Sequence, residues 1–338
     1  MTENAFIAGS SGPTLTADEI AFFRDARPWG FILFKRNCDT PDQIRRLCGE
    51  MRAAVGRMAP ILIDQEGGRV QRLGPPQWPA YPTGRTYGDV FARDAEAGRR
   101  AAWLGARLMA ADLAALGIDV DCLPVLDVPV EGAHDVIGHR AYGVTPGVVS
   151  ELGRAAAEGL LAGGVLPVIK HIPGHGRAGV DSHLALPVVD TPRAVLEASD
   201  FPPFREAAHL PLAMTAHVVY TDLDATAPAT TSKTVIDEVI RGFIGFDGCL
   251  MSDDVSMQAL SGSIGERTAA ALAAGCDLAL HCNGRLDEMI EVAANCRPLE
   301  GRAAARAERA VAMRVAPGDF DVVAARDEFA RLTGVALV

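Results

Sequence analysis

The stretch Gly164-Val165-Leu166-Pro167-Val168-Ile169-Lys170-His171-Ile172-Pro173-Gly174-His175-Gly176 joins an apolar run to a cluster of titratable side chains. The first six residues are typical of a strand that is buried on both faces. One lysine and two histidines follow that strand, and Asp181-Ser182-His183 comes within the same loop. Proteins built from strand–helix units carry their chemistry at the carboxyl ends of the strands. We therefore predict that this loop belongs to an active site.

The same alternation of an apolar strand, a polar loop and an Ala/Leu/Arg-rich helix recurs along the chain. Helices are predicted at Ala95–Leu116 and after Thr145, which is expected to cap a helix that starts with Pro146. Eight units of this kind predict an α/β fold, a single (β/α)8 barrel over residues 1–338 with a helical extension from about residue 298 packed outside it. The predicted strands are Ala5–Ala8, Gly30–Phe34, Ala59–Ile63, Val120–Leu126, Leu166–Ile169, Leu212–Thr215, Gly248–Met251 and Asp277–His281.

A doubly wound parallel sheet is the structural alternative. It is weakened because no Gly-x-Gly-x-x-Gly motif follows the first strand.

Charge and composition narrow the range of functions. The 338 residues carry a net charge of −11, which argues against a nucleic-acid partner. The first residues have neither the basic start nor the long apolar run of a signal peptide or membrane span. Seven scattered cysteines without a Cys-x-x-Cys pair indicate reduced thiols and a cytoplasmic location. We expect no membrane partner.

Polar side chains gather where the predicted strands end. Such a rim of Asp, Arg, Lys and His suits a ligand with many hydroxyl groups, and no glycine-rich phosphate loop is present. The residues in question are Lys35-Arg36-Asn37, Asp64 to Arg69 with Arg72, Asp127, His139-Arg140, Lys170-His171, His217, Asp253-Asp254 and His281-Cys282-Asn283.

Glycoside hydrolysis fits these residues. A retaining glycosidase needs a carboxylate nucleophile and a proton donor about 5 Å away. Asp253 is a candidate nucleophile, and Asp254 is expected to cap the following helix. In Asp181-x-His183 the aspartate would orient the imidazole, which could then donate a proton and later accept one.

Two other classes of function remain open on the residues alone. A metal-dependent barrel hydrolase could draw ligands from His171, His175, His183 and His217, although the first strand has no His-x-His motif. A non-catalytic sugar-binding barrel would have lost the nucleophile or the proton donor, yet candidates for both are present.

Several long motifs resemble glycoside hydrolase family 3, and within it the short bacterial β-N-acetylglucosaminidases of peptidoglycan recycling. The resemblance covers most of the chain. The motifs are Lys-His-Ile-Pro-Gly-His-Gly (170–176), Asp-Ser-His (181–183), Met-Ser-Asp-Asp-Val-Ser-Met (251–257), Gly-Phe-Ile-Leu-Phe-Lys-Arg-Asn (30–37), Asp-Gln-Glu-Gly-Gly-Arg-Val-Gln-Arg (64–72) and Pro-Val-Leu-Asp (124–127).

The resemblance implies a retaining exo-β-N-acetylglucosaminidase with a covalent glycosyl-enzyme intermediate and no cofactor or metal. Asp253 would be the nucleophile, His183 the general acid/base and Asp181 its partner. The substrate would be N-acetylglucosamine linked to 1,6-anhydro-N-acetylmuramic acid in muropeptides, and we expect a monomer. The sugar-contacting positions would be Asp64, Arg72, Arg140, Lys170 and His171.

Some questions stay open at the level of sequence. A histidine acid/base would repel phosphate less than a carboxylate would, so a phosphorylase that transfers the sugar to phosphate is an alternative. The roles of His175, His139 and His217 are not assigned. His139 departs from the small polar or acidic residue expected beside Arg140.

Overall fold

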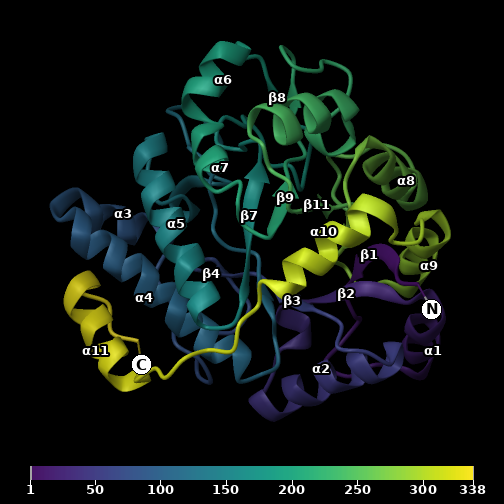
Figure 1. Ribbon diagram of the computed structural model, residues 1–338, viewed down its shortest axis with the longest axis horizontal. Coiled ribbons are helices and arrows are strands. Elements are labelled where there is room, and N and C mark those ends of the chain that lie inside the picture. Colours follow the sequence, from purple (N-terminus) through teal and green to yellow (C-terminus); the bar gives the residue numbers. More distant parts are fainter. Residues whose placement is uncertain (1, 338) are drawn as a thin grey trace.

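The computed structural model describes residues 2–337 and contains the predicted (β/α)8 barrel. Eight parallel strands close on themselves in the order β1-β12-β11-β9-β7-β6-β3-β2, and helices surround them (Figure 1). The strands are β1 (Asn4–Ala8), β2 (Pro28–Leu33), β3 (Ile61–Ile63), β6 (Val120–Asp121), β7 (Leu166–Ile172), β9 (Leu212–Thr215), β11 (Cys249–Asp254) and β12 (Leu278–His281).

Strand β7 is longer than its apolar run predicts. All seven of its residues are buried, and its pairing with β9 continues from Val168 to Ile172. Lys170 and His171 therefore lie within the strand and not in the loop after it. A strand backbone fixes the direction of both side chains more closely than a loop would.

Strand β6 is shorter than predicted because regular pairing ends at Asp121. Pro124 lacks a backbone N–H, so the ladder cannot run on without interruption. An isolated parallel bridge between Val125 and Lys170 keeps the segment beside β7. Asp127, which follows, is thereby held at the mouth of the barrel.

The helices between the strands place their apolar faces on the barrel. Helix α4 ends two residues before the predicted position. Helix α5 begins at Pro146 as predicted, but the Thr145 side chain makes no capping hydrogen bond. The helices are α1 (Ala17–Ala26), α2 (Pro41–Val55), α3 (Gly84–Arg93), α4 (Ala95–Ala114), α5 (Pro146–Ala162), α6 (Arg193–Ser199), α7 (Pro202–Glu206), η4 (Val235–Phe243), α8 (Ile264–Ala274) and α9 (Leu286–Asn295).

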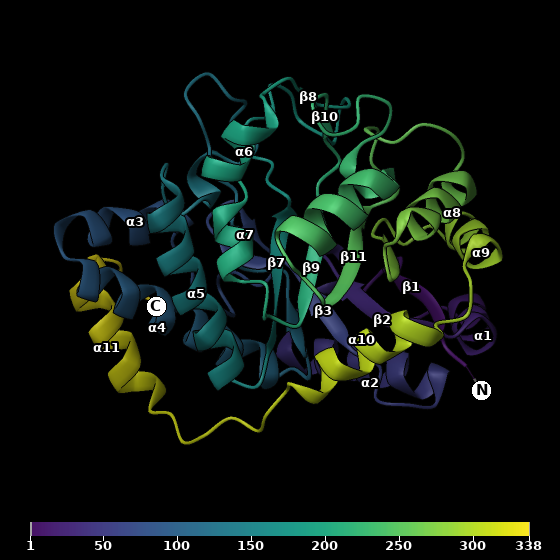
Figure 2. The ribbon, with the colours of Figure 1, turned by 45° about the horizontal axis from the view of Figure 1, so that its top comes forward.

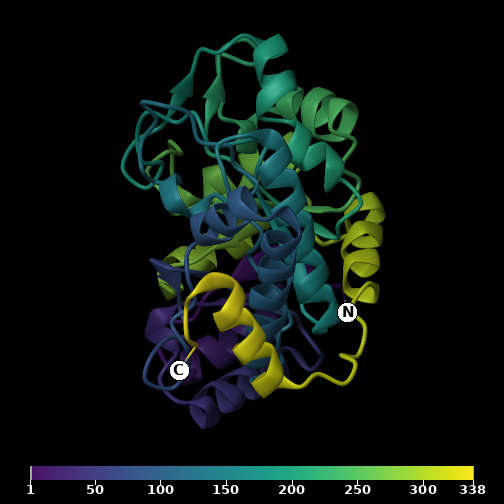
Figure 3. The same ribbon diagram turned by 90° about the vertical axis from the view of Figure 1, so that its left-hand side faces the viewer.

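Two helices follow α9. Helix α10 (Gly301–Ala312) crosses the amino-terminal ends of the strands, where Arg309 donates to the backbone oxygen of Asp247 just before β11. Helix α11 (Val322–Thr333) packs against α4 and α3, as the yellow helix beside the blue ones in Figure 3 shows. Both helices lie away from the opposite, carboxyl-terminal mouth of the barrel.

Short strands lie outside the barrel at its mouth. An antiparallel pair, β4 (Gln65–Gly67) and β5 (Val70–Gln71), follows β3. A parallel pair, β8 (Val188–Val189) and β10 (Val219–Tyr220), lies at the top of Figure 2 and fixes the far end of the loop that leaves β7. Among residues 2–337, no helix combines the length and apolar character needed to cross a membrane.

Candidate active site

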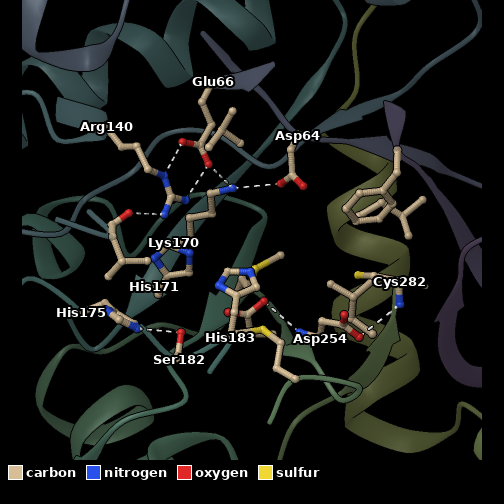
Figure 4. Close-up of a pocket in the computed structure, with 18 of the residues that line it drawn as sticks. Asp64, Glu66, Arg140, Lys170, His171, His175, Ser182, His183, Asp254 and Cys282 are labelled. Atoms are coloured by element: carbon tan, nitrogen blue, oxygen red, sulfur yellow. Dashed lines mark hydrogen bonds and ion pairs between the residues drawn. The ribbon is translucent and has the colours of Figure 1, made fainter. Parts of the chain in front are cut away.

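A cavity of about 390 Å³ opens at the carboxyl ends of the strands. Figure 4 shows Asp64, Arg140, Lys170, His171 and His183 arranged around it. Asp181 does not line the cavity but contacts His183. The predicted site residues that line it are Asp64, Arg72, Arg140, Lys170, His171, His183 and Asp253.

A chain of buried ion pairs forms one wall of the cavity. Lys170 Nζ lies 3.0 Å from Asp64 Oδ1 and 2.6 Å from Glu66 Oε1. Arg140 makes two parallel hydrogen bonds of 2.8 Å to the Glu66 carboxylate, and Arg72 Nη2 donates to Asp64 Oδ2 at 2.8 Å. Bidentate pairing of this kind fixes orientation as well as charge.

The charges in this wall stabilise one another. Burial raises the pKa of the Glu66 carboxyl, but Arg140 and Lys170 outweigh burial and hold that pKa at about 2. The pKa of Asp64 is likewise lowered, because Lys170 and Arg72 overcome its desolvation. Burial lowers the pKa of Lys170, and the two carboxylates more than reverse this. All these groups are ionised at neutral pH, and their lone pairs and N–H groups can bind sugar hydroxyls.

Asp127 organises the strand that carries His171. Its Oδ1 accepts the backbone N–H of His171 at 3.1 Å and that of His175 at 2.6 Å, and its Oδ2 lies 2.7 Å from His171 Nδ1. An ionised carboxylate accepts, so His171 Nδ1 carries the proton. This contact sets the tautomer and leaves Nε2 of His171 for the cavity.

Asp253 lies at the end of β11 and is half-buried. Burial raises its pKa, but nearby His217 and His171, the Asp254 backbone N–H and His183 together lower it. The Asp254 N–H donates to Asp253 Oδ1 at 2.8 Å. The group is therefore ionised at neutral pH, as a nucleophile must be.

The expectation that Asp254 caps the next helix is wrong. Helix α8 is capped by Ser263, nine residues after Asp254 in the chain. The Asp254 carboxylate instead accepts from the Ser256 backbone N–H at 3.0 Å, from the Ser256 hydroxyl at 2.6 Å and from the Cys282 backbone N–H at 3.2 Å. It orders the turn after β11 and ties that turn to the end of β12.

His183 reaches the cavity from the loop that leaves β7. Its side chain is 65% exposed, and its Nδ1 lies 2.8 Å from Asp181 Oδ1. Burial raises the pKa of Asp181, but hydrogen bonds from the His183 backbone and side chain lower it overall. Asp181 is thus a carboxylate that holds Nδ1–H and leaves Nε2 of His183 for proton transfer.

The other candidate metal ligands are engaged within the protein. His175 Nε2 contacts the Ser182 hydroxyl, and the two ring nitrogens of His217 contact the Thr230 hydroxyl and the Asp254 carbonyl. Residues 2–337 contain no group of three or more His, Cys, Asp or Glu arranged to hold a metal ion.

The structure gives a role to two rim residues for which the sequence suggested none. Glu66 joins Lys170 to Arg140, and Asp127 joins His171 to His175. Each follows a predicted strand at the rim, and that position is the only signal in the sequence. His139, by contrast, is exposed and does not line the cavity.

This chain is similar in sequence to known proteins. The Beta-hexosaminidase of Bordetella avium is 39% identical over 277 residues, which cover 81% of this chain and 79% of that protein. The Beta-hexosaminidase of Alkalilimnicola ehrlichii is 41% identical over 281 residues, with the same coverage.

The fold also matches solved structures. The crystal structure of NagZ from Neisseria gonorrhoeae in complex with N-trifluoroacetyl-D-glucosamine superposes with a TM-score of 0.88 at 33% identity, covering 99% of this chain and 98% of that one. Residues 21–313 match the family described as "Glycosyl hydrolase family 3 N terminal domain". This chain belongs to glycosyl hydrolase family 3 and is a glycoside hydrolase.

Proposed function

We propose that this β-N-acetylhexosaminidase removes a terminal, non-reducing N-acetylglucosamine with retention of configuration, through a covalent intermediate on Asp253. The observation that carries the proposal is the pairing of two groups in one cavity. Asp253 is a half-buried, ionised carboxylate, and His183 is an exposed imidazole held by a carboxylate of its own.

The ion-paired wall supports binding of a single terminal sugar. Asp64, Lys170 and Arg140 present fixed charges to hydroxyl groups on one side of the cavity. Because these side chains already pair with one another, they lose little conformational entropy when the sugar binds. The sugar is thereby presented with its anomeric carbon toward Asp253.

In the first step, an Asp253 oxygen attacks the anomeric carbon while the bond to the leaving oxygen breaks. Protonated His183 donates its Nε2 proton to that oxygen, and Asp181 stabilises the imidazolium until the proton is transferred. The leaving sugar departs as an alcohol. The product of this step is a glycosyl ester of Asp253 and a neutral imidazole.

In the second step, neutral His183 accepts a proton from water as the water oxygen attacks the anomeric carbon. The ester bond breaks, the Asp253 carboxylate is regenerated, and the two inversions give net retention.

We further propose muropeptides that contain N-acetylglucosamine linked to 1,6-anhydro-N-acetylmuramic acid as the substrate, in the cytoplasm, with the enzyme as a monomer. The sequence motifs of the peptidoglycan-recycling branch support this. The direct test is product analysis by mass spectrometry after incubation with such a disaccharide-peptide. Release of N-acetylglucosamine supports the proposal, and an intact substrate together with turnover of simple aryl N-acetylglucosaminides would contradict the muropeptide assignment.

The covalent step has its own test. A 5-fluoro N-acetylglucosaminyl fluoride keeps the acetamido group and slows breakdown of the ester, so the intermediate should accumulate. Peptide mapping should find the label on Asp253. Label on another carboxylate would reject Asp253 as the nucleophile.

A further inference from the structure

His175 is a buried side chain to which neither hydrolytic step assigns a role. Its ring packs edge-on against His171, with ring centroids 5.6 Å apart, and its Nε2 lies 3.1 Å from the Ser182 hydroxyl. Burial and the neighbouring His171 lower the pKa of His175 to about 4. The imidazole is therefore neutral at neutral pH and acts only through its hydrogen bond.

The loop is firmly attached up to Ala178. The Tyr220 hydroxyl donates to the Gly174 carbonyl at 2.5 Å, and the His134 backbone N–H donates to the Ala178 carbonyl at 2.8 Å. A Cβ on Gly176 would lie 2.0 Å from the Val128 carbonyl oxygen, so the backbones are in close contact there. His175 stands within this anchored part.

The loop segment after Ala178 is mostly exposed. Among residues 179–186, all of which the structure describes, Ser182 is buried and the others are exposed or half-buried. Ser182 is also the residue between the catalytic pair, Asp181 and His183. Its hydroxyl contacts His175, and so the exposed turn is fastened to the anchored part at its centre.

The turn itself is compact. Asp181 Oδ1 accepts the His183 backbone N–H at 2.9 Å, and the Asp181 carbonyl accepts those of Leu184 and Ala185 at 2.9 and 3.0 Å. These hydrogen bonds hold residues 181–185 in one turn, so the position of Ser182 bears on that of the His183 imidazole.

We propose that His175 is a positioning residue, which acts through the Ser182 hydroxyl to hold the Asp181–His183 pair over the cavity. The inference rests on the proposed role of His183 as general acid/base. Figure 4 shows the contact between His175 and Ser182. The Asp127 carboxylate that orients His171 also accepts the His175 backbone N–H, so one residue anchors both histidines.

The test measures kcat/KM on two substrates that differ in their need for a proton. A methyl N-acetylglucosaminide has a poor leaving group, whereas a dinitrophenyl N-acetylglucosaminide needs little protonation. Ser182→Ala should lower kcat/KM on the methyl glycoside by about 10- to 100-fold, because a small displacement of an acid is costly, and should change the aryl rate by less than about threefold. His175→Ala should behave alike.

Three further variants separate positioning from folding. His175→Gln keeps a side-chain amide near the place of Nε2, which can donate to or accept from the Ser182 hydroxyl, and should recover most of the rate on the methyl glycoside. In a His183→Ala background, Ser182→Ala should cause no further loss. Leu184→Ala, which truncates an exposed side chain on the same turn, should leave both rates unchanged.

The positioning role would be overturned if Ser182→Ala alone lowered kcat/KM equally on the two substrates. It would also be overturned if Ser182→Ala lowered kcat/KM as much in the His183→Ala background as in the unaltered enzyme. If His183→Ala itself lost rate equally on both, the proposed acid role would fall, and the inference with it. The two failures are thus distinguishable.

Discussion

The Lys170 ammonium lies 2.6 Å from Glu66 Oε1 in a position where both side chains are almost fully buried. Breaking a buried pair by removing one partner leaves an uncompensated charge in a medium of low dielectric, and typically costs about 3–5 kcal/mol. The ion-paired wall of the cavity is therefore also a structural element.

Glu66→Gln should weaken the dependence of the free energy of unfolding on pH in the acid range. The folded-state pKa of Glu66, about 2, lies below its usual value of 4.5, so its contribution is fully present above about pH 5. That contribution, on the order of 3 kcal/mol, is lost as the pH falls toward 2. Urea unfolding between pH 2 and 7 measures it. The exposed pair Lys233–Asp237 offers a control, since Asp237→Asn should cost less than about 1 kcal/mol. Parallel pH profiles for Glu66→Gln and the unaltered enzyme would contradict the assignment.

Of the two adjacent aspartates, Asp253 should be needed for turnover and Asp254 for stability. Asp253→Ala should lower kcat by at least about 10³-fold with little effect on the midpoint of unfolding, because the carboxylate that forms the ester is gone. Asp254→Ala should retain measurable turnover but lose about 1–3 kcal/mol of unfolding free energy, because three hydrogen bonds hold the turn after β11. Steady-state kinetics and urea titrations of both variants distinguish them. Full activity of Asp253→Ala would rule out its role.

The sequence predicted the barrel because each strand is a short, continuous apolar run, and eight such runs alternate with helices along the chain. It also predicted several of the side chains that reach the cavity, because residues such as Asp64 and Asp253 stand at strand ends, whereas other predicted rim residues such as His217 do not line it. These inferences depend only on local pattern and on where a parallel strand ends.

Partners could not be predicted in the same way. Glu66 and Arg140 are 74 residues apart and Asp127 and His171 are 44 apart, and nothing in either segment specifies the other. The role expected of Asp254 was wrong for a related reason. A helix cap can be predicted from local sequence. The Asp254 carboxylate instead accepts the backbone N–H of Cys282, which comes near only because β12 pairs with β11.

His183 should matter in proportion to the basicity of the leaving group. In His183→Ala, a methyl N-acetylglucosaminide should lose about 10²- to 10⁴-fold in kcat/KM, whereas an activated aryl glycoside should lose far less in its first step. A plot of log kcat/KM against leaving-group pKa should steepen relative to the unaltered enzyme. Unchanged slope would mean that His183 only positions the substrate and that another group donates the proton.

Turnover should survive exhaustive chelation. Asp253 and His183 between them supply the nucleophile, the proton donor and the base of the proposed steps, and no step calls for a Lewis acid. Rates after dialysis against EDTA should match those before it. Loss of activity that zinc restores would favour a metal-dependent hydrolase.

The enzyme should prefer a 2-acetamido sugar to glucose, and water to phosphate. The aryl N-acetylglucosaminide should exceed the aryl glucoside in kcat/KM by more than about 10²-fold, since a site built to bind an amide leaves polar groups unpaired when the amide is absent.

Phosphate should add no sugar phosphate to the products. The cavity cations Lys170, Arg72 and Arg140 each pair with a carboxylate, which leaves little net positive charge to attract a phosphate dianion. Chromatography of the products with and without phosphate decides the acceptor. A sugar 1-phosphate that grows with phosphate concentration would make the enzyme a phosphorylase and would require that His183, neutral in the second step, admits the dianion beside Asp253.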